Sequence, residues 1–304
     1  TDQATLKPRD VNATGLIQDG TLSPKGKRVL VSARGELFSL PAEQGIVRNV
    51  TRSSGVAERY PSWSPDGKTI AYFSDRTGEY ELTTRPADGT GGETNHTRLG
   101  PGYRYNLFWS PDSKKVAFID QAMKVNVHDF STGTNRVVAR QLWKYHGDLA
   151  AFRVGWSPDS RWLTWGQDLT NQQSAVVLHD LKEDKTHQVT SGFYNDDLPA
   201  FDPDGKYLYF RTTRNFNPIY SELDSTWIYA NGTRMAVVPL TRDLPNPMAP
   251  KNDDEERPKE KKPDPATNAP AATPALAVTN TPPATNAVAT TTNAAPATAA
   301  APTK

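Results

Sequence analysis

Trp63-Ser-Pro-Asp-Gly-Lys-Thr-Ile70 decides how this chain folds, because variants of the same stretch occur five times. The other copies cover residues 22–29, 109–116, 156–163 and 201–208. Their prolines stand at positions 24, 65, 111, 158 and 203, so successive copies are 41, 46, 47 and 45 residues apart. A near-constant spacing of this size indicates a repeat architecture.

Each copy predicts a tight turn between two strands. Proline fixes φ at the first central position of the turn, and the Asp and Gly that follow tolerate the bend. In the second copy a β-branched and aromatic strand follows at 68–73, then a turn at 74–78, a strand at 80–84 and a weaker strand near 95–99. Four short antiparallel strands per repeat form the blade of a β-propeller, so the sequence predicts an all-β propeller with few helices.

The number of blades in the ring stays open at this stage. Five blades could close a small ring, or they could form an arc of a six- or seven-bladed ring. Closure requires a strand across the seam, because an open blade exposes an unpaired edge. Residues 6–17 could supply that strand, and we expect 227–229 and 234–240 to form the outer strands of the last blade.

Composition divides the chain into a β-propeller domain at 1–248 and a tail at 249–304. All seven Trp, eleven Tyr and ten Phe precede position 250. A mixed-charge run follows at 251–262, and the last 42 residues are mostly Pro, Ala, Thr and Asn, with eight prolines. Such a segment has too little apolar surface to offset the entropy of ordering it, so we predict a disordered linker or tail.

Several classes of protein are excluded by composition. Lys plus Arg is 35 and Asp plus Glu is 34, and this balance argues against a nucleic-acid partner. The absence of cysteine excludes disulfides, thiolate metal sites and cysteine nucleophiles. No apolar run is long enough to span a membrane. The chain begins at Thr1 without a leader, so we interpret it as a fragment or a processed chain, and both a cytoplasmic and a periplasmic location stay open.

No catalytic, metal or cofactor site is predicted. The serines before each turn proline are explained by hydroxyl-to-backbone bonds within the turn. The five histidines lack the spacing of a metal site, and His128-Asp129 and His179-Asp180 occupy equivalent blade positions. Asp202-Pro-Asp204-Gly205 lacks the further oxygen ligands of a calcium loop.

The residues that precede each turn are the candidate binding site, because in a propeller they enter the innermost strand beside the central channel. Arginine and tyrosine there can hold a peptide carboxylate or backbone through forked donors and aromatic faces. The alternative is salt bridging between blades, whereas Trp63, Trp109 and Trp156 are expected in the core between blades. We further expect Arg104→Ala and Arg153→Ala to weaken peptide binding without loss of stability. The predicted channel-facing residues are Arg59, Tyr60, Arg104, Tyr105, Arg153, Asp196 and Asp197.

The repeats resemble the blades of TolB-like proteins, and further stretches resemble the second propeller of the tricorn protease family. These stretches are 49–67, 72–82, 215–221, 240–250 and Asp253-Asp-Glu-Glu256, and the resemblance covers roughly residues 15–256. It implies a propeller joined to a PDZ module and to two segments of a serine peptidase, in an oligomeric assembly. The Pro/Ala/Thr tail stands where the catalytic part of the family would begin.

The resemblance implies a non-catalytic propeller that guides or filters oligopeptides or unfolded polypeptide toward an active site on other segments of a serine peptidase. An alternative is a stand-alone TolB-like scaffold that captures one folded partner. A propeller enzyme, such as a glycosidase or the lid of a prolyl peptidase, is a third alternative. Whether the chain is itself an enzyme stays open, because it shows no catalytic constellation.

Overall fold

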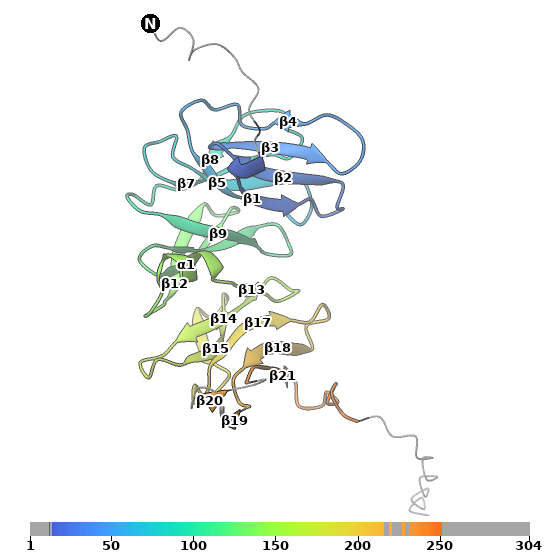
Figure 1. Ribbon diagram of the computed structural model, residues 1–304, viewed down its shortest axis with the longest axis vertical. Helices are drawn as coiled ribbons and strands as arrows, with labels where there is room; N and C mark the ends of the chain where they lie inside the picture. The colour runs from blue at the N-terminus through green and yellow to red at the C-terminus, as the bar shows by residue number, and fades with distance from the viewer. Residues whose placement is uncertain (1–11, 13, 216–218, 221–226, 229–231, 251–304) are drawn as a thin grey trace, which may run out of the picture. The chain divides into compact units, whose positions relative to one another are not determined.

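The computed structural model describes residues 12, 14–215, 219–220, 227–228 and 232–250. Figure 1 shows small antiparallel sheets that follow one another along the longest axis, which confirms the predicted β-propeller architecture. A short 3-10 helix, Thr14–Leu16, precedes the first sheet. The first four sheets each contain four strands in sequential order.

The strands of these blades have the following bounds. The first blade contains β1 (Ile17–Leu22), β2 (Arg28–Ala33), β3 (Glu36–Pro41) and β4 (Arg48–Asn49). The second contains β5 (Glu58–Trp63), β6 (Thr69–Ser74), β7 (Glu81–Pro86) and β8 (Thr94–Asn95). The third contains β9 (Arg104–Trp109), β10 (Lys115–Asp120), β11 (Lys124–Asp129) and β12 (Thr134–Arg140). The fourth contains β13 (Gly155–Trp156), β14 (Trp162–Asp168), β15 (Ser174–Asp180) and β16 (Lys185–Gln188), and helix α1 (His146–Ala151) precedes it.

The fifth sheet differs from the sequence prediction. It pairs β17 (Asp196–Phe201) with β18 (Tyr207–Thr212) and β18 with β21 (Arg234–Pro239). The expected outer strand at 234–240 is therefore present. The expectation that 227–229 forms an outer strand of this blade is wrong for residues 227 and 228. These form β20 (Trp227–Ile228), which pairs with β19 (Ile219–Tyr220) in a separate hairpin, and Tyr229 lies outside the described residues. Such a hairpin has no counterpart in the other repeats, so the repeat pattern could not predict it.

The repeated Ser-Pro-Asp motif forms a hydrogen-bonded turn, as its residue types predict. In the second blade the Ser64 hydroxyl donates to Asp66 at 2.6 Å and accepts from the Thr69 N–H at 3.0 Å. The Asp66 carboxylate also accepts from the Lys68 N–H at 3.0 Å. Gly67 has a φ of 73°, which a side chain would disfavour. The serine therefore stabilises the turn.

Tryptophan links neighbouring blades, in agreement with its predicted core position. The Trp109 indole N–H donates to the Ser62 carbonyl of the second blade at 3.4 Å, and the Trp156 indole N–H donates to the Phe108 carbonyl of the third blade at 2.9 Å. Both rings lie at the same place in the repeat. The third and fourth blades are thus each joined to the preceding blade by packing and by one hydrogen bond from an equivalent indole.

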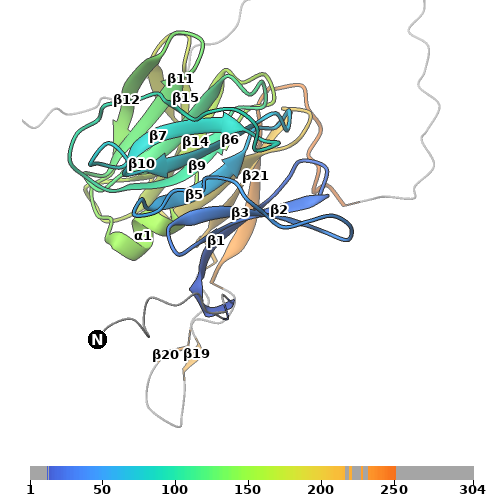
Figure 2. The same ribbon diagram turned by 90° about the horizontal axis from the view of Figure 1, so that it is seen from above.

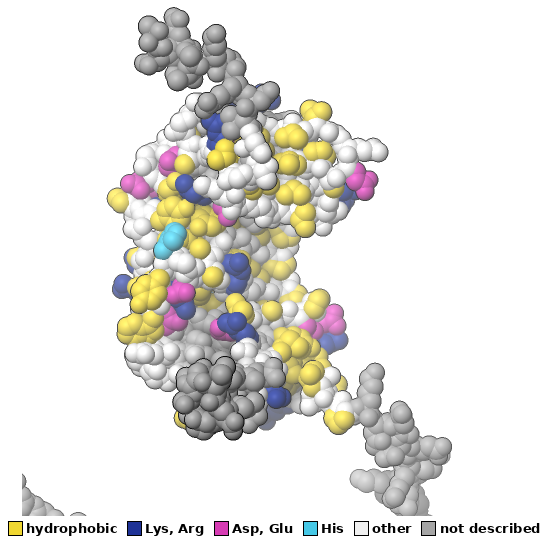
Figure 3. Space-filling view, in the orientation of Figure 1, with side chains coloured by type: hydrophobic (Ala, Val, Ile, Leu, Met, Phe, Trp, Pro, Cys, Tyr) yellow, Lys and Arg dark blue, Asp and Glu magenta, His cyan; other side chains and the backbone are white. Residues whose placement is uncertain are grey.

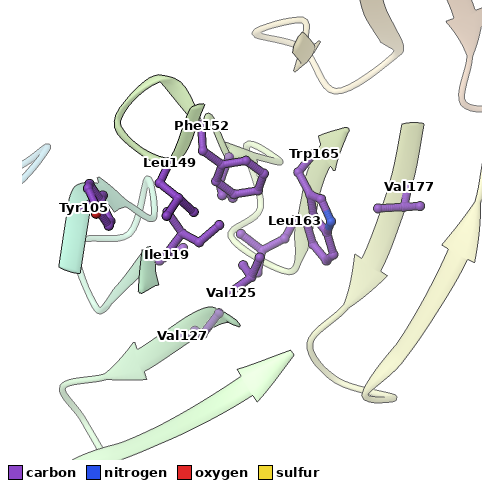
Figure 4. Close-up of a cluster of buried hydrophobic side chains, with 11 residues drawn as sticks. Tyr105, Ile119, Val125, Val127, Leu149, Phe152, Leu163, Trp165 and Val177 are labelled. Carbon is purple, nitrogen blue, oxygen red and sulfur yellow. The ribbon is translucent and has the colours of Figure 1, made fainter. Parts of the chain in front are cut away.

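Helix α1 fills the space between the third and fourth blades. Figure 4 shows its Leu149 and the adjacent Phe152 between Ile119 on one side and Leu163 and Trp165 on the other. All five side chains are buried. The Asp148 carboxylate accepts from the Tyr145 N–H at 3.3 Å, which satisfies one donor at the start of the helix. The helix replaces the first half of the innermost strand, and β13 is therefore only two residues long.

The described blades form an arc. The first and fifth blades lie at opposite ends of the longest axis in Figure 1. Figure 2 shows β1, β5 and β9 on the same side as α1, with β11, β12 and β15 away from it. We refer to the side formed by the innermost strands β1, β5, β9, β13 and β17 as the inner side. In the predicted seam strand at 6–17, residues 6–11 and 13 lie outside the described residues, and Ile17 begins β1. The predicted tail lies outside the described residues from 251 onward.

Candidate functional site

Three innermost strands carry the same bulge on the inner side. The bulged residues stand five positions before the turn proline and have left-handed backbones, with φ of 51° at Tyr60, 55° at Asn106 and 50° at Leu198. A bulge adds an unpaired residue to the strand and changes the direction of its side chain. A left-handed backbone costs a non-glycine residue about 1–2 kcal/mol. Its recurrence in three blades shows that the bulge belongs to the repeat.

The distance to the turn proline corrects the grouping of the candidate residues. Seven positions before the turn proline the chain has Glu58, Arg104 and Asp196, so Arg104 corresponds to Glu58 and does not correspond to Arg59. All three side chains are buried, with exposed fractions of 0%, 4% and 0%. Charged groups at this position lie within the blades and not on their inner surface.

Arg104 and Asp196 both have partners inside the fold. The Arg104 guanidinium donates to the carbonyls of Gly102 at 2.5 Å and Gly100 at 2.7 Å. The Asp196 carboxylate accepts from Arg214 at 3.0 Å. Neither contact is the expected salt bridge between blades. Arg104 holds the loop before β9, and Asp196 pairs with an arginine just after β18 of its own blade.

Arg59 and Tyr60, by contrast, lie in an aromatic cluster on the inner side. Four phenols form this tyrosine cluster: Tyr60, Tyr80, Tyr103 and Tyr105. Ring centroids are 5.2 Å apart for Tyr80 and Tyr103, 4.9 Å for Tyr103 and Tyr105, and 6.1 Å for Tyr60 and Tyr105. Figure 3 shows hydrophobic side chains beside a histidine on the face over β9 and α1. The cluster joins the second and third blades.

Arg59 lies across two of these rings. Its guanidinium carbon is 5.9 Å from the centroids of both Tyr80 and Tyr103. Its Nε donates to the Tyr80 hydroxyl at 3.0 Å and its Nη1 to Gln18 at 2.8 Å. Among the described residues its Nη2 has no hydrogen-bond partner, so one end of the guanidinium can still donate to a ligand.

Burial favours the neutral form of three phenols of the cluster. Burial raises the pKa of Tyr60, Tyr103 and Tyr105, and the neighbouring phenols add to that rise for Tyr60 and Tyr105. Burial also raises the pKa of the nearby Asp19, although the Tyr60 backbone N–H and the Arg59 charge oppose this rise. Neutral phenols can both donate and accept, which suits a peptide backbone at the half-buried Tyr60 and Tyr103. Tyr105 is 3% exposed and packs in the core, so the expectation that it faces the channel is wrong.

The cluster also contains a residue from α1. The Tyr105 hydroxyl and His146 Nδ1 are 2.8 Å apart, and their rings are 5.4 Å apart. No sequence pattern connects His146 with Tyr105, because a helix replaces the expected strand there. Tyr80 was missed as well, since it follows the second turn of its blade and not the repeated one.

Arg153 and Asp197 lie together in a second region of the inner side. Both line a cavity of about 490 Å³ that Lys144 and Arg211 also border. Asp197 accepts two hydrogen bonds from Arg211, at 2.6 Å and 2.5 Å. Arg153 is exposed and its Nη1 donates to the Phe152 carbonyl at 3.0 Å. The expectation that Arg153 lies on an innermost strand is wrong, because it follows α1 and precedes β13.

In the part of the chain that the structure describes, no group of three or more His, Cys, Asp or Glu residues is placed to hold a metal ion. Within the same residues, no helix has the length and apolar character to cross a membrane. His128 and His179, equivalent in the sequence, are both buried at the ends of β11 and β15.

Comparison with known proteins places the chain in a family. A family model, the tricorn protease second beta propeller domain, matches residues 17–287. Tricorn protease homolog 1 of Streptomyces coelicolor is 26% identical over 250 residues, which are 81% of this chain and 23% of that protein. The tricorn protease of Thermoplasma volcanium is 28% identical over 189 residues, 60% of this chain and 16% of that protein.

A solved structure has the same fold. The crystal structure of the tricorn protease superposes with a TM-score of 0.67 at 20% sequence identity, and the match covers 83% of this chain and 24% of that one. The chain therefore spans about a quarter or less of the length of these relatives. On the family match and the five-bladed arc, the chain belongs to the tricorn protease family, as a second β-propeller domain.

Proposed function

We propose that this propeller portion of a tricorn protease binds oligopeptides or unfolded polypeptide on its inner side and guides them toward a serine-peptidase active site on other segments. Its partners would be those catalytic segments and the PDZ module that the family resemblance implies, within an oligomer. The propeller itself would select and deliver substrate without cleaving it.

The observation that carries the proposal is the tyrosine cluster with Arg59 lying across it. Aromatic faces bind peptide side chains with little sequence preference, and an arginine beside them supplies forked donors for a backbone carbonyl or a carboxylate.

Fluorescence anisotropy with a labelled, unstructured peptide of mixed composition tests the proposal. Arg59→Ala and Tyr60→Asn are each expected to weaken binding about three- to tenfold, the size of a lost cation–π or aromatic contact. Asn is the residue at the equivalent bulge of the next blade, so Tyr60→Asn removes the ring and keeps the backbone. Arg140→Ala, on the outer strand β12, is the matched control and should leave the peptide affinity unchanged.

Three results would contradict the proposal. Wild-type affinities that differ strongly among unrelated peptides would contradict a filter of broad specificity. Capture of one folded partner at fixed stoichiometry, without peptide binding, would support the scaffold alternative. Hydrolysis of the peptide by the purified chain would show that the propeller does more than guide substrate.

A further inference from the structure

A second cavity lies between the first and second blades, at their turn ends and away from the tyrosine cluster. It has a volume of about 900 Å³ and is bordered by the Ser23–Pro24 turn, the β3–β4 connection, the β5–β6 turn and the turn after β7. We call it the basic groove, because of the five cations that border it: Lys25, Lys27, Arg28, Arg48 and Arg52.

The positive charge of the basic groove exceeds the negative charge that borders it. Within the described residues, none of the five cations has a carboxylate at ion-pair distance. Arg28 donates to the Ile46 carbonyl at 3.0 Å, and Arg48 donates to the Asp88 carbonyl at 3.1 Å. Two acids also border the groove: Asp66 accepts from Ser64, and Asp88 accepts from Thr90. Hydrogen bonds from Thr90 lower the pKa of Asp88, and the charge of Arg48 adds to this, so five cations face two acids.

The repeat supplies an internal comparison. The corresponding cavity between the fourth and fifth blades has a volume of about 410 Å³, and its charged lining residues are Asp159 and Asp204, with no cation among the residues that line it. Lys25 occupies the turn position at which the other four copies have aspartate, at 66, 112, 159 and 204. In three of those turns the aspartate accepts from the turn serine, as Asp66, Asp112 and Asp159 do. The first blade therefore has a cation at a position where aspartate would stabilise the turn.

The basic groove also has apolar walls. Ile46 and Val47 border it with exposed fractions of 70% and 60%, and Trp63 and Ala87 contribute further apolar surface. The Trp63 indole N–H is buried without a hydrogen-bond partner among the described residues, whereas Trp109 and Trp156 bond to the preceding blade. A ligand that is only anionic would leave the apolar walls uncovered.

We propose that the basic groove docks an acidic peptide segment of a partner polypeptide, with apolar side chains placed between its carboxylates. The carboxylates would pair with Lys25, Lys27 and Arg52, and the apolar side chains would cover Ile46 and Val47. This complementarity of charge and apolar surface favours a peptide over a nucleic acid, whose outer surface is phosphate. The site is separate from the inner side, so it can act whether or not the inner side binds substrate.

The test uses the full chain and a fluorescein-labelled peptide of about 12 residues in which Glu and Asp alternate with Leu and Phe. A sibling peptide replaces every acid by its amide, and an oligonucleotide of thymidines supplies phosphate without apolar side chains. We expect the acidic peptide to bind and to weaken when salt rises from about 50 to 200 mM. The amide peptide and the oligonucleotide should bind at least about tenfold more weakly.

Substitutions of the groove cations test whether the acidic peptide binds in the basic groove. Lys25→Asp restores the aspartate of the other turns, so it should keep or raise the melting temperature while it weakens peptide binding about threefold or more. Adding Arg52→Asp should bring the loss to about tenfold. Lys27→Glu and Lys114→Glu form a matched pair, because both lysines stand three positions after a turn proline. Only Lys27→Glu should weaken binding.

The proposal is overturned by any of four results. The acidic peptide does not bind the wild-type chain, the amide peptide binds equally well, the oligonucleotide binds more tightly, or Lys114→Glu weakens binding as much as Lys27→Glu. If Arg52→Asp lowers the melting temperature, the peptide affinity of the Lys25→Asp variant alone tests the proposal, because that change is expected to stabilise its turn.

Discussion

Arg104 is the residue whose replacement distinguishes a structural from a binding role most sharply. Arg104→Ala removes two hydrogen bonds from a charged donor and leaves the Gly100 and Gly102 carbonyls without it. The same loop is held from its other side by Glu81, which accepts from the N–H groups of Leu99 at 2.7 Å and Gly100 at 3.2 Å. Hydrogen bonds to charged groups contribute about 1.5–3 kcal/mol each, and relief of the buried charge offsets part of this loss. The expected loss in the free energy of unfolding is therefore about 2–4 kcal/mol.

Urea unfolding followed by tryptophan fluorescence measures this loss, and thermal unfolding should show a melting temperature lower by about 5–15 °C for a domain of this size. Arg59→Ala is the matched comparison, because Arg59 lies on the neighbouring innermost strand and is only partly buried. It should cost about 1 kcal/mol or less. If Arg104→Ala leaves the melting temperature within about 2 °C of wild type, the assignment of Arg104 to the loop is refuted.

Further predictions follow from the blade interfaces, the buried histidine and the bulges. Trp156→Phe leaves the Phe108 carbonyl without its donor and should cost about 1–2 kcal/mol in urea unfolding. Burial lowers the pKa of His128 to about 4 from 6.5, so stability is full above pH 6.5 and falls as the pH drops toward 4, by up to about 3 kcal/mol. His128→Gln should remove this part of the loss in the free energy of unfolding at low pH. A variant whose stability depends on pH as the wild type does would contradict the assignment to His128. Leu198→Gly, at a left-handed bulge, should keep the free energy of unfolding or raise it by up to about 1 kcal/mol, whereas Leu198→Val should lower it.

The fold was predictable because the turn motif encodes its own geometry. Ser64, Pro65 and Asp66 form a turn from local bonds alone, and the same bonds recur wherever the motif does. The large residue before each motif predicted the contact with the preceding blade, as Trp156 shows. The hairpin of β19 and β20 and helix α1 were missed, because each occurs once and breaks the repeat.

The candidate site was less predictable because the same Arg-Tyr pair occurs at two different distances from the turn proline. The sequence grouped Arg59 with Arg104, although they stand six and seven positions before their prolines. One position moves a side chain to the other face of a strand, and Arg104 is buried for that reason. Arg59 contacts Tyr80 across a turn of its own blade and Tyr103 across the interface with the next blade. No pattern in a single sequence predicts either contact.

Photo-crosslinking tests the central claim most directly. An unstructured peptide of mixed composition that carries one benzoylphenylalanine is irradiated with the full chain, and the crosslinked residues are located by mass spectrometry. The account predicts crosslinks concentrated in the segments around Tyr60 and Tyr103, and their loss in Tyr60→Asn. Crosslinks confined to the basic groove, or spread evenly over the outer strands, would contradict peptide binding on the inner side.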